Sequence, residues 1–480
     1  MAITSASQTR AAAVQATLSD NYLDIQNNGW AQQYLPDLME KEAEVFGKRT
    51  ISGFLAQVGA EEAMSADQVV WSEQGRLHLS YKGTIGTHTT STIQLDTDID
   101  GVDVGTTHGV RVGDTVLIAS AALTVRAFVS QINSDTNGDQ NTGATDFITA
   151  IPYDAEHLDN SGFGTNDAVT ILVYGSEHSK GTTGKVGANE PSFTSFTNKP
   201  IIMKDMYQVS GSDASQVGWV EVSGEDGQNG YMWYLKAEGD TRSRFADYTE
   251  MALVEAEKAA DASTILGGAN GLVGTEGLFS AISNRGHQTS GVTGVNAATD
   301  LAEFDAILAE FDKNGAIEEN MLFLNRATSL AFDDMLASMN SYGAGGTSYG
   351  VFDNNEDMAL NLGFSGFRRG SYDFYKSDWK YLNDLSTRGG INARNVAGAI
   401  RGVIIPAGTS SVYDEQMGKN LKRPFLHVRY RASQTESRKM KTWITGSVGA
   451  VTSDLDAMTV NFLTERCLVV QAANNFMLMN

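Results

Sequence analysis

The segment Met440–Asn480 constrains the fold most, because it alternates apolar runs with turn residues up to the last position. Positions 443–451 and 468–470 have the composition of strands, and a Ser/Asp cluster at 453–456 can cap a short helix between them. We therefore expect strand, short helix and strand, with the C-terminus built into a sheet.

The chain of 480 residues is too long for one simple core, so we expect two to four compact units in a mixed α+β fold. Its 49 glycines and 6 prolines indicate many flexible turns between strands. The only cysteine, Cys467, lies in an apolar run, which predicts a buried thiol and excludes an intrachain disulfide. No run approaches the ~20 apolar residues of a membrane span, and we expect a soluble protein made in a cytoplasm, without a membrane partner.

The net charge of −23 argues against a protein whose main task is to bind nucleic acid. Residues 83–179 hold 13 acidic side chains against only Arg111 and Arg126. Residues 419–441 are instead basic, with a net charge of +7. This basic run consists of Lys419, Lys422, Arg423, Arg429, Arg431, Arg438, Lys439 and Lys441, with Glu436 as its one acidic residue. We consider it a candidate inter-subunit contact that meets an acidic surface; a solvated basic face and a single-stranded nucleic-acid surface remain open.

The first half of the chain divides into an arm and a β-rich region. Residues 1–62 are too poor in large apolar residues to fold alone, which predicts an arm held by a partner subunit. Alternation over Val69–Tyr81 predicts a strand pair around Gln74-Gly75. Short, evenly spaced strands at about 83–179 predict a small barrel. Its expected core is Val112, Val116, Ile118, Phe128, Ile132, Phe147, Ile148 and Ile171.

Helical patterns dominate the middle of the chain. A long helix is predicted over Thr241–Leu266, capped by Asp240 or Thr241 and ended by Gly267-Gly268. A second helix is expected to start in a capping box at Asp300 and to end at Gly315. A buried strand at 321–324 and a helix capped by Thr328 follow.

Two acidic turns are weak calcium candidates, since alternate carboxylates and a glycine bend can wrap the ion. They are Asp96, Asp98 and Asp100 in one turn, and Asp135, Asn137 and Asp139 in the other. Neither has the complete loop pattern, and the same residues are ordinary in hairpin turns. No histidine spacing, phosphate loop or nucleophile motif indicates catalysis, so we expect no cofactor and no enzyme.

The order of these elements resembles the Hong Kong 97 (HK97) fold of major capsid proteins from tailed phages, possible lineages being crAss-like phages and marine podoviruses. The resemblance implies an N-terminal arm at 1–62 and an extended loop at 63–205 that carries the inserted β-barrel. It implies a peripheral domain with the long spine helix at 206–275, an axial domain at 276–439 and C-terminal peripheral strands at 440–480. The resemblance rests on the order of the elements along the chain, because no short sequence motif is diagnostic of the family.

The function implied is a structural protein that assembles as hexamers and pentamers into an icosahedral shell. Such a virion capsid forms in the host cytoplasm and encloses double-stranded DNA without reading its sequence. Portal and decoration or auxiliary capsid proteins are the further partners implied. Two alternatives stay open: another phage structural protein such as a tail tube, and a secreted calcium-binding β-rich adhesin.

Overall fold

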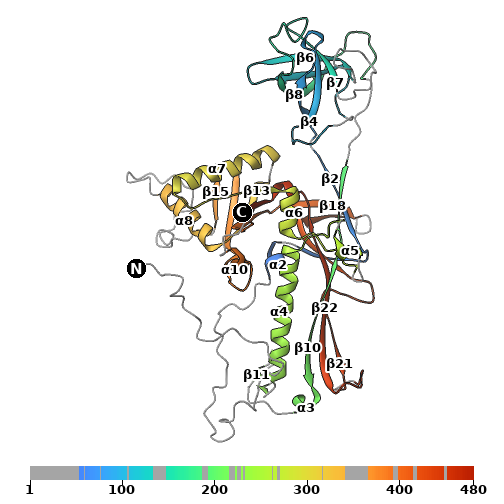
Figure 1. Cartoon of the computed structure of the whole chain (residues 1–480), viewed down its shortest axis with the longest axis vertical. Coiled ribbons are helices and arrows are strands. Elements are labelled where there is room, and N and C mark those ends of the chain that lie inside the picture. The colour runs from blue at the N-terminus through green and yellow to red at the C-terminus, as the bar shows by residue number, and fades with distance from the viewer. Residues whose placement is uncertain are drawn as a thin grey trace. The chain divides into compact units, whose positions relative to one another are not determined.

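The computed structural model describes residues 53–340 and 366–480, with gaps at 59, 76, 105–107, 133–146, 186–192, 216–221, 224–228, 231–232, 262, 268–270, 316, 393–397, 415–418 and 448–450. The chain divides into two compact units (Figure 1). Unit 1 comprises positions 1–71 and 196–480, and unit 2 comprises Ser72–Ser195. The expected mixed α/β character is confirmed. Most of the expected arm lies outside the described residues.

Unit 2 is a closed six-stranded barrel with the strand order β3-β4-β7-β6-β5-β8. The strands are β3 (Ser80–Ile85), β4 (Thr92–Asp98), β5 (Asp114–Ala119), β6 (Thr124–Ile132), β7 (Phe147–Pro152) and β8 (Ala168–Ser176). Val116, Ile118, Ile148 and Ile171 are in its core as expected. Val112 is 39% exposed, and Phe128 points outward because Val125, Ala127 and Val129 take the inward positions of β6.

The expected strand pair within Val69–Tyr81 is wrong. Strand β2 (Val69–Gln74) instead pairs with β9 (Phe193–Asn198), the strand at the other end of unit 2. Strand β3 is hydrogen-bonded on both sides within the barrel, to β4 and β8, so neither of its edges is left for β2.

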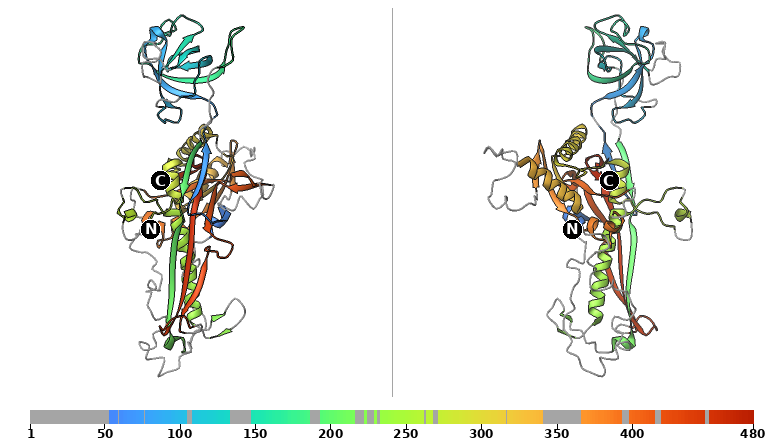
Figure 2. Two further views of the ribbon diagram at one scale, coloured as in Figure 1. Left: turned by 90° about the vertical axis from the view of Figure 1, so that its right-hand side faces the viewer. Right: turned by 60° about the vertical axis from the view of Figure 1, so that its left-hand side comes forward.

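The first sheet of unit 1 brings together strands from distant parts of the sequence. Its order is β1-β20-β22-β10, and β21 also pairs with β22. The strands are β1 (Ala60–Met64), β10 (Ile201–Ser210), β20 (Leu426–Arg431), β21 (Lys441–Gly446) and β22 (Ala457–Val470). Helix α4 (Trp233–Glu255) runs beside β10 and β22 in Figures 1 and 2. Phe245 of α4 packs against Phe462 with ring centroids 6.0 Å apart.

The long helix is present, but it begins and ends earlier than predicted. Thr241 is internal to α4, where its hydroxyl donates to the Ala237 carbonyl, and so it caps nothing. After Glu255 the chain meets Gly277, whose N–H donates to the Ala256 carbonyl at 2.8 Å. A Cβ on Gly277 would lie 2.8 Å from Ala256 backbone atoms, so this crossing requires glycine.

The second sheet of unit 1 has six strands in the order β13-β23-β17-β14-β16-β15. They are β13 (His287–Thr289), β14 (Glu319–Leu324), β15 (Gly366–Arg369), β16 (Tyr372–Asp378), β17 (Gly402–Pro406) and β23 (Met477–Met479). Helices α7 (Ala297–Asn314) and α8 (Arg326–Asn340) pack on it around Phe304, Phe332 and Phe374. The predicted strand at 321–324 and the end of α7 at Gly315 are confirmed.

Both predicted helix caps in this region are wrong by a few residues. Asn296 Oδ1 accepts from Thr299 N at 3.0 Å and caps α7, while Asp300 is buried and accepts from Gly294 N. Asn325 likewise accepts from Thr328 N and caps α8. Asparagine, aspartate and threonine are all common N-cap residues, so the path of the chain decides between neighbouring candidates.

The C-terminal segment joins both sheets of unit 1. β21 and β22 are antiparallel partners, and the described residues 451–456 between them contain no helix, so the predicted short helix is wrong. β23 confirms the expected strand at the end of the segment. The remaining elements are α2 (Phe54–Val58), a 3-10 turn at His88–Thr90, α3 (Gly211–Ala214), β11 (Val222–Ser223), β12 (Asn229–Gly230), α5 (Thr264–Gly267), α6 (Leu278–Arg285), α9 (Lys380–Asn383), α10 (Arg388–Asn392), β18 (Thr409–Asp414), β19 (Lys419–Pro424) and a 3-10 turn at Ala473–Asn475. No helix in the described ranges has the length and apolar character needed to cross a membrane.

Candidate functional site

The basic run predicted as a contact surface lies beside acidic residues of the same chain. β1 and β20 are parallel neighbours, and their register sets Glu62 opposite Arg429. The Arg429 guanidinium binds the Glu62 carboxylate at 2.8 Å, and Arg431 binds Asp67, just beyond β1. The ion pairs follow from the alternation of each strand, which places these side chains on one face.

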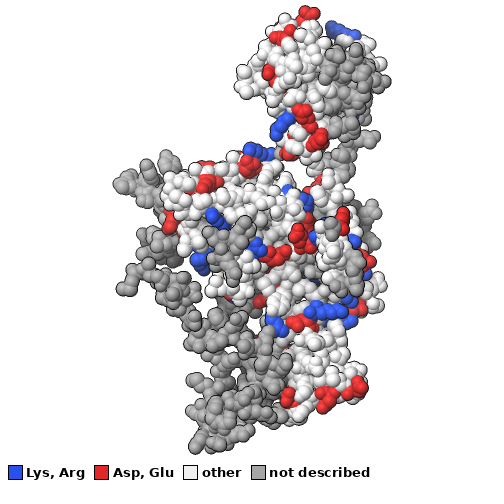
Figure 3. Space-filling view, viewed as in Figure 1, with Lys and Arg blue, Asp and Glu red and all other residues white. Residues whose placement is uncertain are grey.

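Two further carboxylates bind basic side chains of this sheet, Glu465 on the same face and Glu61 on the opposite face. Glu465 of β22 binds Arg438 at 2.5 Å and Arg431 at 3.8 Å. Glu61 of β1 binds Arg466 at 2.9 Å and also Lys439. Burial lowers the pKa of Arg466, and the neighbouring Glu61 opposes this shift. Acidic and basic side chains accordingly lie next to each other on the visible face of unit 1 (Figure 3).

Five of the eight predicted contact cations therefore have acidic partners within the chain: Arg429, Arg431, Arg438, Lys439 and Lys441. Lys441 binds Glu436 at 2.6 Å, and that contact lowers the pKa of Glu436. The other three, Lys419, Lys422 and Arg423, lie in β19, which pairs with β18. A contact between this run and a neighbouring subunit stays a prediction.

The first calcium candidate forms a hydrogen-bonded hairpin turn. Asp96 and Asp98 end strand β4, and Asp100 lies in the turn that follows. Asp98 Oδ1 accepts from Val102 N at 2.8 Å, and Gly101 has a φ of 87°, which favours glycine. Asp135, Asn137 and Asp139 lie outside the described residues. Within the described ranges, no group of three His, Cys, Asp or Glu side chains is arranged to hold a metal ion.

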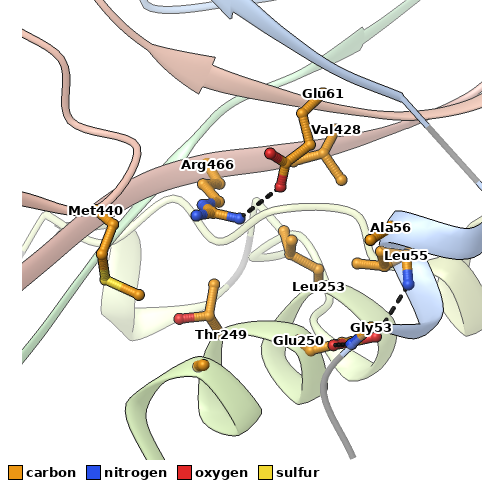
Figure 4. Close-up of a pocket in the computed structure, with 11 residues that line it drawn as sticks. Gly53, Leu55, Ala56, Glu61, Thr249, Glu250, Leu253, Val428, Met440 and Arg466 are labelled. Carbon is orange, nitrogen blue, oxygen red and sulfur yellow. Dashed lines mark hydrogen bonds and ion pairs between the residues drawn. The ribbon is translucent and has the colours of Figure 1, made fainter. Parts of the chain in front are cut away.

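A cavity of about 170 Å³ lies between α2, α4 and the first sheet (Figure 4). Glu250 of α4 lines it, and its two oxygens accept from Gly53 N at 2.7 Å and Leu55 N at 2.9 Å. The Arg466–Glu61 ion pair lies on the other side of the same cavity. Burial raises the pKa of Glu250, although the backbone N–H donors oppose the shift.

Sequence reasoning missed the acidic half of these contacts. Glu61 and Glu62 stand in a segment predicted as an arm, and Glu250 stands in a helix predicted only for its apolar stripe. A signal was available for Glu250, because it precedes the buried Leu253 and Val254 by three and four positions and so falls on the buried side of α4. Nothing in the sequence names Leu55 as its partner.

Comparisons with known proteins give structural neighbours only. No protein family model matches this chain. No curated protein matches it either. The similar solved structures are phage capsid structures.

Three of these structures match over nearly the whole of both chains. That of Mycobacterium phage Ogopogo is 10% identical and covers 94% of this chain and 98% of its own, with a TM-score of 0.39. The capsid of a native GTA particle is 10% identical. The match covers 95% of this chain and 98% of that one, also with a TM-score of 0.39. That of Gordonia phage Cozz is 10% identical and covers 97% of each chain, with a TM-score of 0.38.

Proposed function

We propose that this chain is a major capsid protein with an HK97-like fold, whose copies assemble into the icosahedral head of a tailed phage. One observation supports the proposal: unit 1, whose sequence is interrupted by the barrel of unit 2, contains a long helix that lies along a sheet. A 23-residue helix, α4, lies along a sheet that contains β10 and the C-terminal strand β22. The second sheet, with α7 and α8, is built from the chain between them and from β23.

The proposed assignment of parts keeps the boundaries expected from the sequence. Residues 1–62 serve as the arm, and 63–205 as the extended loop that carries the barrel. Residues 206–275 and 440–480 form the peripheral domain, with α4 as its spine helix. Residues 276–439 form the axial domain, which surrounds the axis of each hexamer or pentamer.

The charge distribution supports a container for DNA that does not bind it tightly. The net charge is −23, and Arg429, Arg431 and Arg438 are bound by carboxylates of the same chain. Side chains held in this way offer few counterion-releasing contacts to phosphate. We propose that the DNA is enclosed without sequence-specific binding, that assembly takes place in the host cytoplasm, and that portal and auxiliary capsid proteins are further partners.

Electron microscopy and sedimentation of the overexpressed full chain test this function. Closed shells or capsomer rings are expected, because identical subunits usually assemble with closed symmetry. Long tubes would support a tail-tube protein instead. A monodisperse monomer across a wide range of concentration and salt would contradict assembly altogether.

A further inference from the structure

The outer wall of the barrel carries an apolar face that the described residues of unit 2 leave exposed. Four side chains on it are substantially exposed: Ile151 by 42%, Tyr153 by 53%, Leu172 by 38% and Tyr174 by 52%. They belong to β7, β8 and the residue after β7 (Figure 1). Contiguous exposed apolar surface of this kind usually marks an interaction site.

Strand register shows that these side chains are neighbours. In one row, Leu172 of β8 is opposite Leu117 of β5, which is opposite Arg126 of β6. Tyr153 extends this row, because its N–H donates to the Arg126 carbonyl at 3.0 Å. The next row places Ile151 opposite Phe128. The face therefore spans the neighbouring strands β8, β5, β6 and β7 without interruption.

This barrel face also carries one cation and one anion that are not neutralised by each other. Arg126 is exposed and has no ion pair among the described residues. The Glu177 carboxylate is exposed and accepts from the Tyr153 hydroxyl at 2.5 Å, but it has no cationic partner in the described part of the chain. A surface with one charge of each sign is complementary to a rotated copy of itself.

We propose that the barrel face docks against the same face of a second copy of this chain, so that Arg126 of each copy meets Glu177 of the other. A two-fold contact contains the Arg126–Glu177 pair twice, and it buries the tyrosines and leucines of the face between the two copies. The remaining acidic residues of the two barrels repel only weakly beyond ~8 Å at physiological salt. The inference rests on the proposed function, since assembled particles supply neighbouring copies.

Charge reversal tests the pairing directly. Arg126→Glu and Glu177→Arg each place like charges opposite one another, whereas the double variant restores opposite charges if the face contacts itself. Two exposed pairs of up to ~1 kcal/mol each correspond to a weakening of the contact by up to about thirtyfold in each single variant. Recovery in the double variant is the expected result. Equal loss in single and double variants would show that another molecule occupies the face and would overturn the inference.

Cysteine cross-linking gives a second readout that does not depend on charge. Cys467 is buried, and burial raises the pKa of its thiol to about 12, so an introduced surface cysteine is the only reactive one expected in the described chain. Particles of Leu172→Cys are expected to form disulfide-linked dimers on mild oxidation. Val102→Cys, 63% exposed in the turn after β4 and outside the face, is the matched control.

Three outcomes separate this inference from the proposed function. Dimers from Leu172→Cys but not from Val102→Cys support the contact. Particles that form normally but give no dimers, or equal amounts from both variants, overturn it and leave the capsid function intact. Failure of the unsubstituted chain to form particles contradicts the proposed function itself.

Discussion

Glu250 Oε1 accepts a hydrogen bond from the backbone N–H of Leu55 at 2.9 Å, although the two residues are 195 positions apart. This bond attaches α2 to the C-terminal part of α4. The adjacent Phe54 then stacks on Trp379 with ring centroids 4.2 Å apart. A helix of five residues is unstable by itself, so α2 depends on these tertiary contacts.

Replacing Glu250 is expected to change how stability depends on pH. Because burial raises its pKa, the folded chain holds the proton at pH values where the unfolded chain has released it. The contribution of this group to stability is therefore largest below the ordinary value of 4.5 and falls as pH rises from there to the raised pKa. Glu250→Gln should remove this dependence, as measured by denaturant unfolding over that range. A wild-type-minus-variant difference that does not vary with pH would contradict it.

Asn198, the last residue of β9, is expected to be a polar residue on which stability depends strongly. It is 1% exposed, and its Nδ2 donates to the Leu468 carbonyl at 2.6 Å and to the Glu276 carbonyl at 3.0 Å. Asn198→Ala leaves buried groups unsatisfied, with an expected loss of about 3 kcal/mol in the free energy of unfolding. Asn160→Ala, at an exposed position of unit 2, is the control and should change stability by less than about 0.5 kcal/mol.

Arg429 and Glu62 test whether the basic run acts within the chain or between subunits. Their contact at 2.8 Å is partly buried, so Arg429→Glu is expected to lower the free energy of unfolding by about 2 kcal/mol. Glu62→Arg in the same chain should restore most of it, as chemical denaturation of unassembled protein would show. If Arg429→Glu impairs assembly but leaves subunit stability unchanged, the side chain acts at an inter-subunit contact.

The barrel is expected to be dispensable for the folding of unit 1. It has its own core, which includes Val116, Ile118, Ile148 and Ile171. Replacing residues 80–176 by a short glycine-serine linker should therefore leave a soluble chain with a cooperative unfolding transition. Circular dichroism and denaturant titration measure this outcome. Loss of all soluble protein would mean that the barrel is needed for folding.

The local sequence pattern was sufficient to predict a helix or strand whose apolar residues pack against a single core. The stripe of Phe304 and Phe311, the glycine end at Gly315 and the strand at 321–324 all follow from periodicity and helix-capping chemistry. The small barrel was likewise predicted from evenly spaced short strands. In these segments the sequence alone determined the type of element, because hydrophobic spacing differs between helix and strand.

Only the tertiary structure decided which elements meet. β2 pairs with β9, more than a hundred positions away, and Gly277 ends the path of α4 by crossing close to Ala256. In the candidate site, too, only the tertiary structure decided which charged side chains meet. The basic residues of the run 419–441 could be found by composition, but their carboxylate partners Glu61, Glu62 and Glu465 come from other strands. Strand register brings these charges together, and register depends on the packing of the whole sheet and not on any local pattern.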